Sequence, residues 1–139
     1  MIKHIIFDLD GVLVDTKLIH YKALNLALIN ENEKYEINWD EHLKFYDGLS
    51  TLKKLEVLLI KKKLPKKKFS KIIEQKNKFT KRLLNKEIKF NQKLFDLFFQ
   101  ISRKYKISVA SNAIRETVEQ CLRILKITKF VGFVISNED

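Results

Sequence analysis

Residues 1–15 read MIKHIIFDLDGVLVD, and this stretch decides the fold. Residues 2–8 are a continuous apolar run, typical of a strand that is buried on both faces of a sheet. The run ends at Asp8 and Asp10, whose i, i+2 spacing places both side chains on the same side of a strand. Gly11 then frees the backbone to turn away. Two carboxylates at the end of a buried strand predict a site where one attacks a substrate or binds metal and the other handles a proton.

Length and composition describe a small globular protein. The chain has 139 residues, of which 45% are hydrophobic and 32% are charged, as expected for one domain or a core with a modest insertion. Its single cysteine, Cys121, cannot form an internal disulfide, and we interpret it as a small buried residue. No secretory signal precedes the motif and no apolar run reaches membrane-spanning length. We therefore expect a cytoplasmic protein that does not contact a membrane.

The net charge of +11 is concentrated in the middle of the chain. Residues 16–90 hold 19 Lys and Arg against 9 Asp and Glu, and Lys61–Lys68, the lysine run, is the densest part. Such a run can hold phosphate backbones. It contains no arginine and no interleaved aromatic side chains, which single-strand-binding surfaces use. We therefore favour a solvated loop over a nucleic-acid site.

Helical spacing of apolar side chains dominates residues 17–85, and no strand pattern interrupts it. This segment is predicted to form an all-helical insertion over residues 16–85. The core would then consist of residues 1–15 and 86–139. The side chains that we expect to cap helices are those of Thr16, Asn38, Ser50 and Asn91.

After residue 90 the pattern alternates between helix and strand. Helices are predicted over 91–104 and 115–126, and strands over 107–110 and 130–135. Strands separated by helices predict an α/β fold with a parallel, right-handed sheet and with its chemistry outside the carboxyl ends of the strands. Asp8–Gly11 and Ser111–Asn112 both follow strands and are therefore expected at that edge.

Two of these segments resemble motifs of one family. Asp8–Asp15 has the D-x-D-G-V-x-x-D form that opens the haloacid dehalogenase-like phosphotransferases, in their beta-phosphoglucomutase and phosphoglycolate phosphatase branch. Val109–Asn112 is similar to the second motif of that family, a strand that ends in Ser or Thr. The resemblance implies a Rossmann-like parallel core, here incomplete with about three strands, and an inserted helical cap.

The resemblance also implies a chemistry. Asp8 would be the nucleophile that forms an aspartyl-phosphate, and Asp10 would be the general acid and base. Mg²⁺ would bind the Asp8 carboxylate and the Asp10 backbone carbonyl. Gly11, Ser111 and Asn112 would contact the substrate, with the Ser111 hydroxyl on its phosphate.

Three residues of the insertion are further candidates for substrate binding. His20 matches a histidine near the acid–base aspartate in this branch, although a lone helical histidine is more often structural. Thr51 stands where the sugar-phosphate mutase has an arginine that holds a second phosphate, which favours a monophosphatase. Lys54, in the same loop and helix, could meet an anionic substrate.

The family's later elements, a lysine and an acidic pair that completes the magnesium site, have no counterpart in these residues. Without the later strands, Lys3–Phe7 would be an exposed apolar edge. Three accounts fit: an incomplete sequence, a split or decayed gene, or a short form completed by a partner chain. A partner or a missing C-terminal segment would then complete the sheet.

We therefore expect a fragment of a magnesium-dependent phosphatase that acts on a small phosphorylated metabolite. The alternatives are a sugar-phosphate mutase and a non-catalytic fragment or basic binding module.

Overall fold

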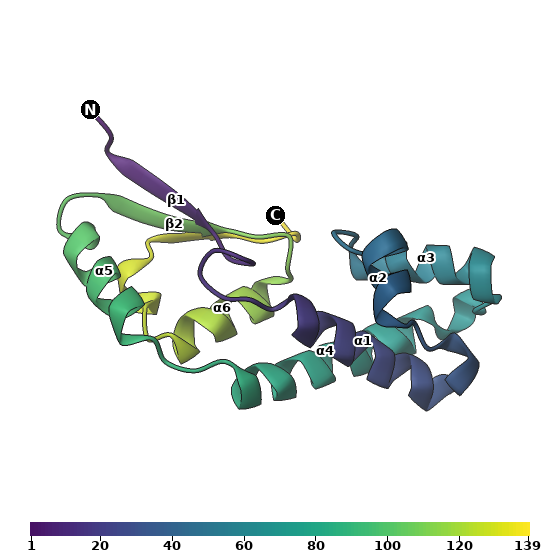
Figure 1. The fold of residues 1–139 in the computed structure, drawn as a ribbon. Helices are drawn as coiled ribbons and strands as arrows, with labels where there is room; N and C mark the ends of the chain where they lie inside the picture. The colour runs from purple at the N-terminus through teal and green to yellow at the C-terminus, as the bar shows by residue number, and fades with distance from the viewer. The chain divides into compact units, whose positions relative to one another are not determined.

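Three parallel strands form one sheet in the order β1-β2-β3. The computed structural model describes all 139 residues, and the strands are β1 (His4–Asp8), β2 (Lys106–Ala110) and β3 (Phe133–Ile135) (Figure 1). The expected α/β fold with a parallel Rossmann-like sheet and a helical cap is confirmed. The third strand begins later than expected, because Thr128–Phe130 forms a 3-10 turn and Val131 closes it. An apolar run alone could not separate that turn from the strand.

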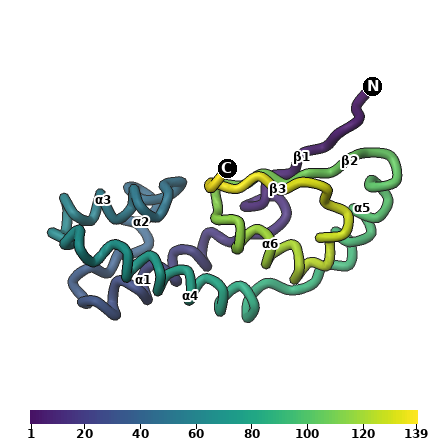
Figure 2. The backbone as a smooth tube through the Cα atoms, turned by 180° about the vertical axis from the view of Figure 1, so that it is seen from behind, coloured from purple at the N-terminus to yellow at the C-terminus, as the bar shows by residue number.

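Two helices cover one face of this sheet (Figures 1 and 2). They are α5 (Gln92–Ser102) and α6 (Arg115–Ile124). The α5 side chain Phe98 is fully buried, and its ring lies 4.9 Å from that of Phe7 on β1. Both helices end two residues before the expected position, and after α6 the backbone of Lys126 is left-handed at φ +59°. Together with the sheet and residues 1–17, these helices belong to the sheet unit, Met1–Lys17 and Leu83–Asp139.

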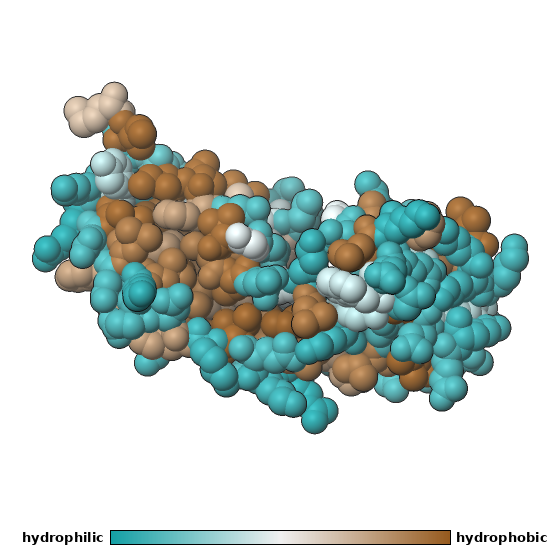
Figure 3. Space-filling view, in the orientation of Figure 1, coloured by the Kyte–Doolittle hydropathy of each residue, from teal (hydrophilic) through white to brown (hydrophobic).

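The opposite face of the sheet carries exposed apolar side chains. Ile6, Ser108 and Phe133 form one row across the three strands, and Ile6 and Phe133 are 59% and 62% exposed. Ser108, between them in this row, is buried and hydrogen-bonds His4 Nε2 at 2.8 Å. In the orientation of Figure 1, Figure 3 also shows hydrophobic side chains gathered on the surface of this unit. The sheet is thus covered by helices on one face and open on the other.

The helical unit, Leu18–Arg82, has its own core. Its helices are α1 (Lys17–Glu31), α2 (Trp39–Phe45), α3 (Thr51–Lys62) and α4 (Phe69–Glu87), with short 3-10 turns at Glu33–Tyr35 and Lys66–Lys68. No helix of the chain is both long and apolar enough to cross a membrane. The buried side chains that form this core are those of Leu24, Ala27, Leu28, Tyr35, Ile37, Tyr46, Leu55, Leu58, Leu64, Phe69 and Ile72.

Three of the four expected helix caps are confirmed. Asn38, Ser50 and Asn91 accept hydrogen bonds from the backbone N–H three residues later, at 2.8, 3.4 and 3.1 Å. The hydroxyl of the fourth, Thr16, instead donates to Asp10.

Candidate active site

The first candidate segment follows β1. Asp8 is the last residue of that strand and pairs in register with Ala110 of β2. Because the strands are parallel, their carboxyl ends lie at the same edge of the sheet. Ser111 directly follows Ala110, so this edge receives both Asp8–Asp10 and Ser111, as the sequence pattern predicts.

A tight turn after Asp8 holds the second aspartate. Gly11 has φ +77°, a left-handed conformation that other residues adopt at a cost. Its N–H donates to the carbonyl of Val14 at 2.7 Å, and the Val14 N–H donates back to Leu9 at 3.1 Å. Leu9 is fully buried and Val14 is 9% exposed, so apolar packing anchors the turn from inside. Gly11 therefore has a conformational role in positioning Asp10.

Two hydroxyl groups hold the Asp10 carboxylate. Thr16 Oγ1 donates to Asp10 Oδ1, and Ser111 Oγ donates to Asp10 Oδ2 at 3.3 Å. The Ser111 oxygen also accepts a hydrogen bond from Ala113 N–H at 3.0 Å. The two sequence motifs are thus joined directly, through Asp10 and Ser111. Asn112, the last residue of the second motif, is exposed in the same loop.

The Asp8 carboxylate is freer than that of Asp10. Its Oδ1 accepts the backbone N–H of Leu9 at 2.7 Å, while Oδ2 accepts no hydrogen bond within the chain. Asp8 is exposed. It therefore presents one uncommitted oxygen at the edge of the sheet, as a nucleophile or a metal ligand requires.

The donor set at this edge fits Mg²⁺ in its chemistry. Mg²⁺ binds oxygen ligands, commonly one or two carboxylates together with substrate phosphates and water. Asp8 Oδ2 and the Asp10 backbone carbonyl are oxygens that no group of the chain occupies. The chain holds no cluster of three or more His, Cys, Asp or Glu side chains suited to a metal ion. The protein ligands at this edge would be the Asp8 carboxylate and the Asp10 carbonyl, with substrate phosphate and water at the other positions.

The other candidates, His20, Thr51 and Lys54, lie in the helical unit. Burial and the nearby charges of Lys76 and Lys54 lower the pKa of His20 to about 3, and His20 Nδ1 is buried without a hydrogen-bond partner. Burial also lowers the pKa of Lys54, while Asp47 opposes that shift. Thr51 is the first residue of α3. His20 and Lys54 therefore share one electrostatic environment with Lys76.

Sequence reasoning missed two residues that act on the candidates: Thr16, which binds Asp10, and Lys76, whose charge lowers the pKa of His20. Thr16 was expected only to cap a helix, because its contact with Asp10 depends on the geometry of the Gly11 turn. Lys76 is only 9% exposed and lies four residues after the buried Ile72 on α4. A lysine on the apolar stripe of a helix is a signal that the sequence does contain.

Much of the lysine run is engaged within the helical unit. Lys62 pairs with Glu41 at 3.2 Å, and Lys68 pairs with Glu31 at 3.1 Å. Lys61 Nζ lies 3.4 Å from the centroid of the Phe45 ring. Half of the six lysines thus have partners within the helical unit.

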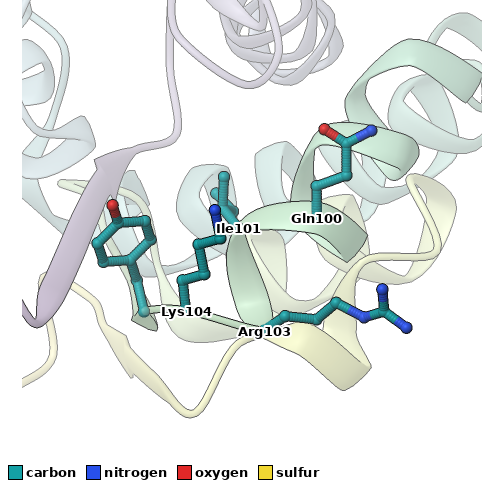
Figure 4. A pocket seen from close by; sticks show the side chains of 5 residues that line it. Gln100, Ile101, Arg103 and Lys104 are labelled. Carbon is teal, nitrogen blue, oxygen red and sulfur yellow. The ribbon is translucent and has the colours of Figure 1, made fainter.

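An open hollow of about 390 Å³ lies elsewhere in the sheet unit (Figure 4). Its lining residues are Gln100, Ile101, Arg103, Lys104 and Tyr105. Tyr105 directly precedes β2, which places the hollow by the amino end of that strand. It is therefore separate from the carboxyl edge that carries Asp8 and Ser111.

The fold and this edge define a class of protein: an α/β protein with a carboxylate pair at the carboxyl ends of parallel strands. The sequence profile of the haloacid dehalogenase-like hydrolases matches residues 5–139, and the chain belongs to that family. No curated protein matches the chain.

Solved structures share the fold. CbbY of Rhodobacter sphaeroides, in complex with xylulose-1,5-bisphosphate, has a TM-score of 0.82 at 20% identity, with 98% of this chain and 64% of that chain covered. The beta-phosphoglucomutase of Clostridium difficile has a TM-score of 0.74 at 23% identity, covering 100% and 63%. A predicted phosphoglycolate phosphatase of Haemophilus somnus has a TM-score of 0.74 at 17% identity, covering 99% and 63%. The chain therefore spans 63–64% of the length of these three proteins.

The depressed pKa of His20 predicts that stability depends on pH. The unfolded chain protonates His20 near pH 6.5, whereas the folded chain does so only near pH 3. The contribution of the neutral His20 ring to the free energy of unfolding is therefore fully present above pH 6.5, and it falls as the pH drops from 6.5 towards 3. Between pH 7 and pH 5, which lies above the range of the carboxylates, the loss should be about 2 kcal/mol. Urea unfolding of the wild type and of His20→Gln measures it, and an equal pH slope in both proteins would contradict the prediction.

Proposed function

We propose that the complete site is that of a magnesium-dependent phosphatase acting on a small phosphorylated metabolite through an aspartyl-phosphate on Asp8. One observation carries the proposal: an uncommitted Asp8 oxygen lies at the same sheet edge as an Asp10 carboxylate held by the Ser111 hydroxyl. The membership of the hydrolase family supports it.

In this proposal each side chain has one task. Asp8 Oδ2 attacks phosphorus, and the bond to the leaving oxygen breaks. For this step Asp10 must first be protonated: it gives that proton to the leaving oxygen, and the carboxylate that remains takes a proton from the water that hydrolyses the aspartyl-phosphate. Ser111 Oγ–H, which now donates to Asp10, turns to a phosphate oxygen. Mg²⁺, bound by the Asp8 oxygen that does not attack, Oδ1, and by the Asp10 carbonyl, would neutralise charge on the transferring group.

His20, Thr51 and Lys54 are proposed to take part in selecting the substrate, and we propose the same role for Lys76. Lys54 is half-buried and Lys76 is buried in the helical unit, and the charges of both lower the pKa of His20. A neutral His20 can donate or accept a hydrogen bond, while the lysines favour an anion. This combination suits a small, polar phosphorylated molecule, which also supports a cytoplasmic location.

A sugar-phosphate mutase is the second candidate. The likeness to a beta-phosphoglucomutase favours it. Thr51 opposes it, because a threonine cannot replace the guanidinium expected there to grip a second phosphate. The non-catalytic alternative, a basic binding module, receives less support because half of the lysine run is engaged internally.

Hydrolysis of an aryl phosphate separates these functions. A phosphatase releases aryl alcohol with Mg²⁺, stops when EDTA is added, and needs no activator. A mutase requires a sugar bisphosphate for turnover. A basic binding module shows neither activity, and it binds nucleic acid with an affinity that falls steeply with salt.

We further propose that another polypeptide segment completes the sheet at β1. Parallel sheets are normally covered on both faces, yet Ile6, Phe133 and Ile135 are exposed on one face, and β1 is a free edge. The connections β1-β2 and β2-β3 carry α5 and α6 over the other face. These connections add strands in the direction from β1 to β3. A right-handed crossover connection that passes over the open face would add its strand in the opposite direction, at the free edge of β1. The chain covers 64% and 63% of two similar proteins, so those proteins have additional residues, and we propose that such residues include this segment.

The added strand would bring its carboxyl end beside Asp8, where further ligands for the metal are needed. Hydrogen exchange of the β1 amides tests this proposal. These amides should be exposed in the 139-residue chain and become protected when the segment is present. Equal exchange in both forms would refute it.

A further inference from the structure

Two loops at the carboxyl edge of the sheet are tied to each other. The site loop, Ser111–Ala113, follows β2, and the terminal turn, Ser136–Asp139, follows β3. Ser111 N–H donates to the Ile135 carbonyl at 3.0 Å, and Asn137 N–H donates to the Ala113 carbonyl at 3.1 Å. The backbone of the site loop is thus fixed at both ends by residues in or next to the terminal turn.

Arg115 is the side chain that connects the two loops. Its Nη2 donates to Asp139 Oδ1 and Oδ2 at 2.6 and 2.5 Å, and it lies 3.3 Å from the Val134 carbonyl. Its backbone N–H, in the first turn of α6, donates to Glu138 Oε2 at 2.7 Å. A carboxylate is favoured at a helix N-terminus. Both acidic residues of the turn therefore bind the residue that begins α6.

Asp139 is itself held by its own turn. Its Oδ2 accepts from Ser136 N–H at 2.7 Å and from Ser136 Oγ at 2.9 Å. The hydrogen bond from Ser136 N–H and the pairing with Arg115 lower the pKa of Asp139 to about 2. The contact is therefore charge-assisted at neutral pH and belongs to a network of several groups, which distinguishes it from an isolated surface ion pair.

From this network we infer that Arg115 and Asp139 are positioning residues, which hold the site loop so that Ser111 Oγ, itself fixed by the Ala113 N–H, faces a bound phosphate. The inference rests on the proposed function of Ser111. Neither residue needs to touch the substrate: Arg115 acts through the start of α6, and Asp139 acts through Arg115. Because Arg115 and Asp139 are 38% and 42% exposed, their loss should disturb the loop more than the overall stability.

Arg115→Met and Asp139→Asn test the inference, with inorganic phosphate as the probe. Each variant should weaken phosphate binding about tenfold and should raise the exchange rates of the Ala113 and Asn137 amides about tenfold, while Val109 in β2 stays protected. Arg115→Lys retains a cation and should recover most of both effects. Since the two residues act as one unit, the double variant should be no worse than Arg115→Met alone.

Arg123→Met is the matched control. Arg123 lies on the same helix and has a looser partner, Glu119, at 3.9 Å, so its replacement should change neither readout. Unchanged exchange in Arg115→Met and Asp139→Asn overturns the inference, as does equal weakening by Arg123→Met. A wild-type chain that binds no phosphate counts against the proposed function instead, and the exchange rates still decide the role of Arg115.

Discussion

Replacement of Asp8 by Asn is expected to lower magnesium-dependent hydrolysis of an aryl phosphate by at least about a thousandfold, since loss of a nucleophile costs factors of this order or more. The amide of Asn cannot form the acyl-phosphate. Its carbonyl oxygen can still accept the N–H of Leu9, the hydrogen bond that Asp8 Oδ1 makes. Because Asp8 is exposed, the free energy of unfolding should change by less than about 1 kcal/mol. Steady-state rates and urea unfolding measure the two quantities.

Asp15→Asn is the control for this substitution. Asp15 is also an exposed aspartate of the opening motif, and its carboxylate makes only a long 3.4 Å contact to the Lys17 N–H. Its replacement removes the same charge a few residues away and should leave most of the activity. The intact mass after incubation with acetyl phosphate gives a second readout, because Asp8→Asn should abolish covalent labelling and Asp15→Asn should not. Retention of more than a tenth of the activity by Asp8→Asn would exclude Asp8 as the nucleophile.

The main elements of the site were predictable because their signals are local in the sequence. The apolar run before Asp8 and the short strand before Ser111 identify two parallel strands, and parallel pairing then brings their carboxyl ends to one edge. No distant contact has to be known for that step. The same is true of the caps Asn38, Ser50 and Asn91, which depend on residues three positions away.

What the sequence did not predict depends on contacts between segments. Thr16 reaches Asp10 because the turn at Gly11 folds the chain back, and a helix cap is the simpler reading of a threonine at that position. The role of Arg115 could not be predicted, because its partner Asp139 lies 24 residues away on another loop. The start of β3 was placed too early, since Phe130 packs against Phe95 from a 3-10 turn and leaves the strand pattern unchanged. In each case a tertiary contact decides between two locally acceptable structures.

Because one face of the sheet is open, the stability of the sheet unit depends mainly on the packing at its covered face. Only α5 and α6 pack on the sheet, so the apolar contacts that hold β1, and with it Asp8, come mainly from one side. Phe98 is the largest fully buried side chain of α5, and its ring lies against that of Phe7. A change at Phe98 therefore tests how firmly α5 holds the strand that carries the nucleophile.

Phe98→Ala should destabilise the sheet unit by about 3–5 kcal/mol, because it removes a fully buried ring and leaves a cavity that the rigid sheet cannot fill. Phe99→Ala is the control on the next position of α5, where the ring is 46% exposed and the loss should be under about 1.5 kcal/mol. Urea unfolding followed by amide signals of β1 and β2 measures the sheet unit separately from the helical unit. If both variants lose equal stability, the packing of α5 on β1 is not what holds the strand. If Phe98→Ala also raises the exchange of the Leu9 amide, which donates to Asp8, the same packing positions the nucleophile.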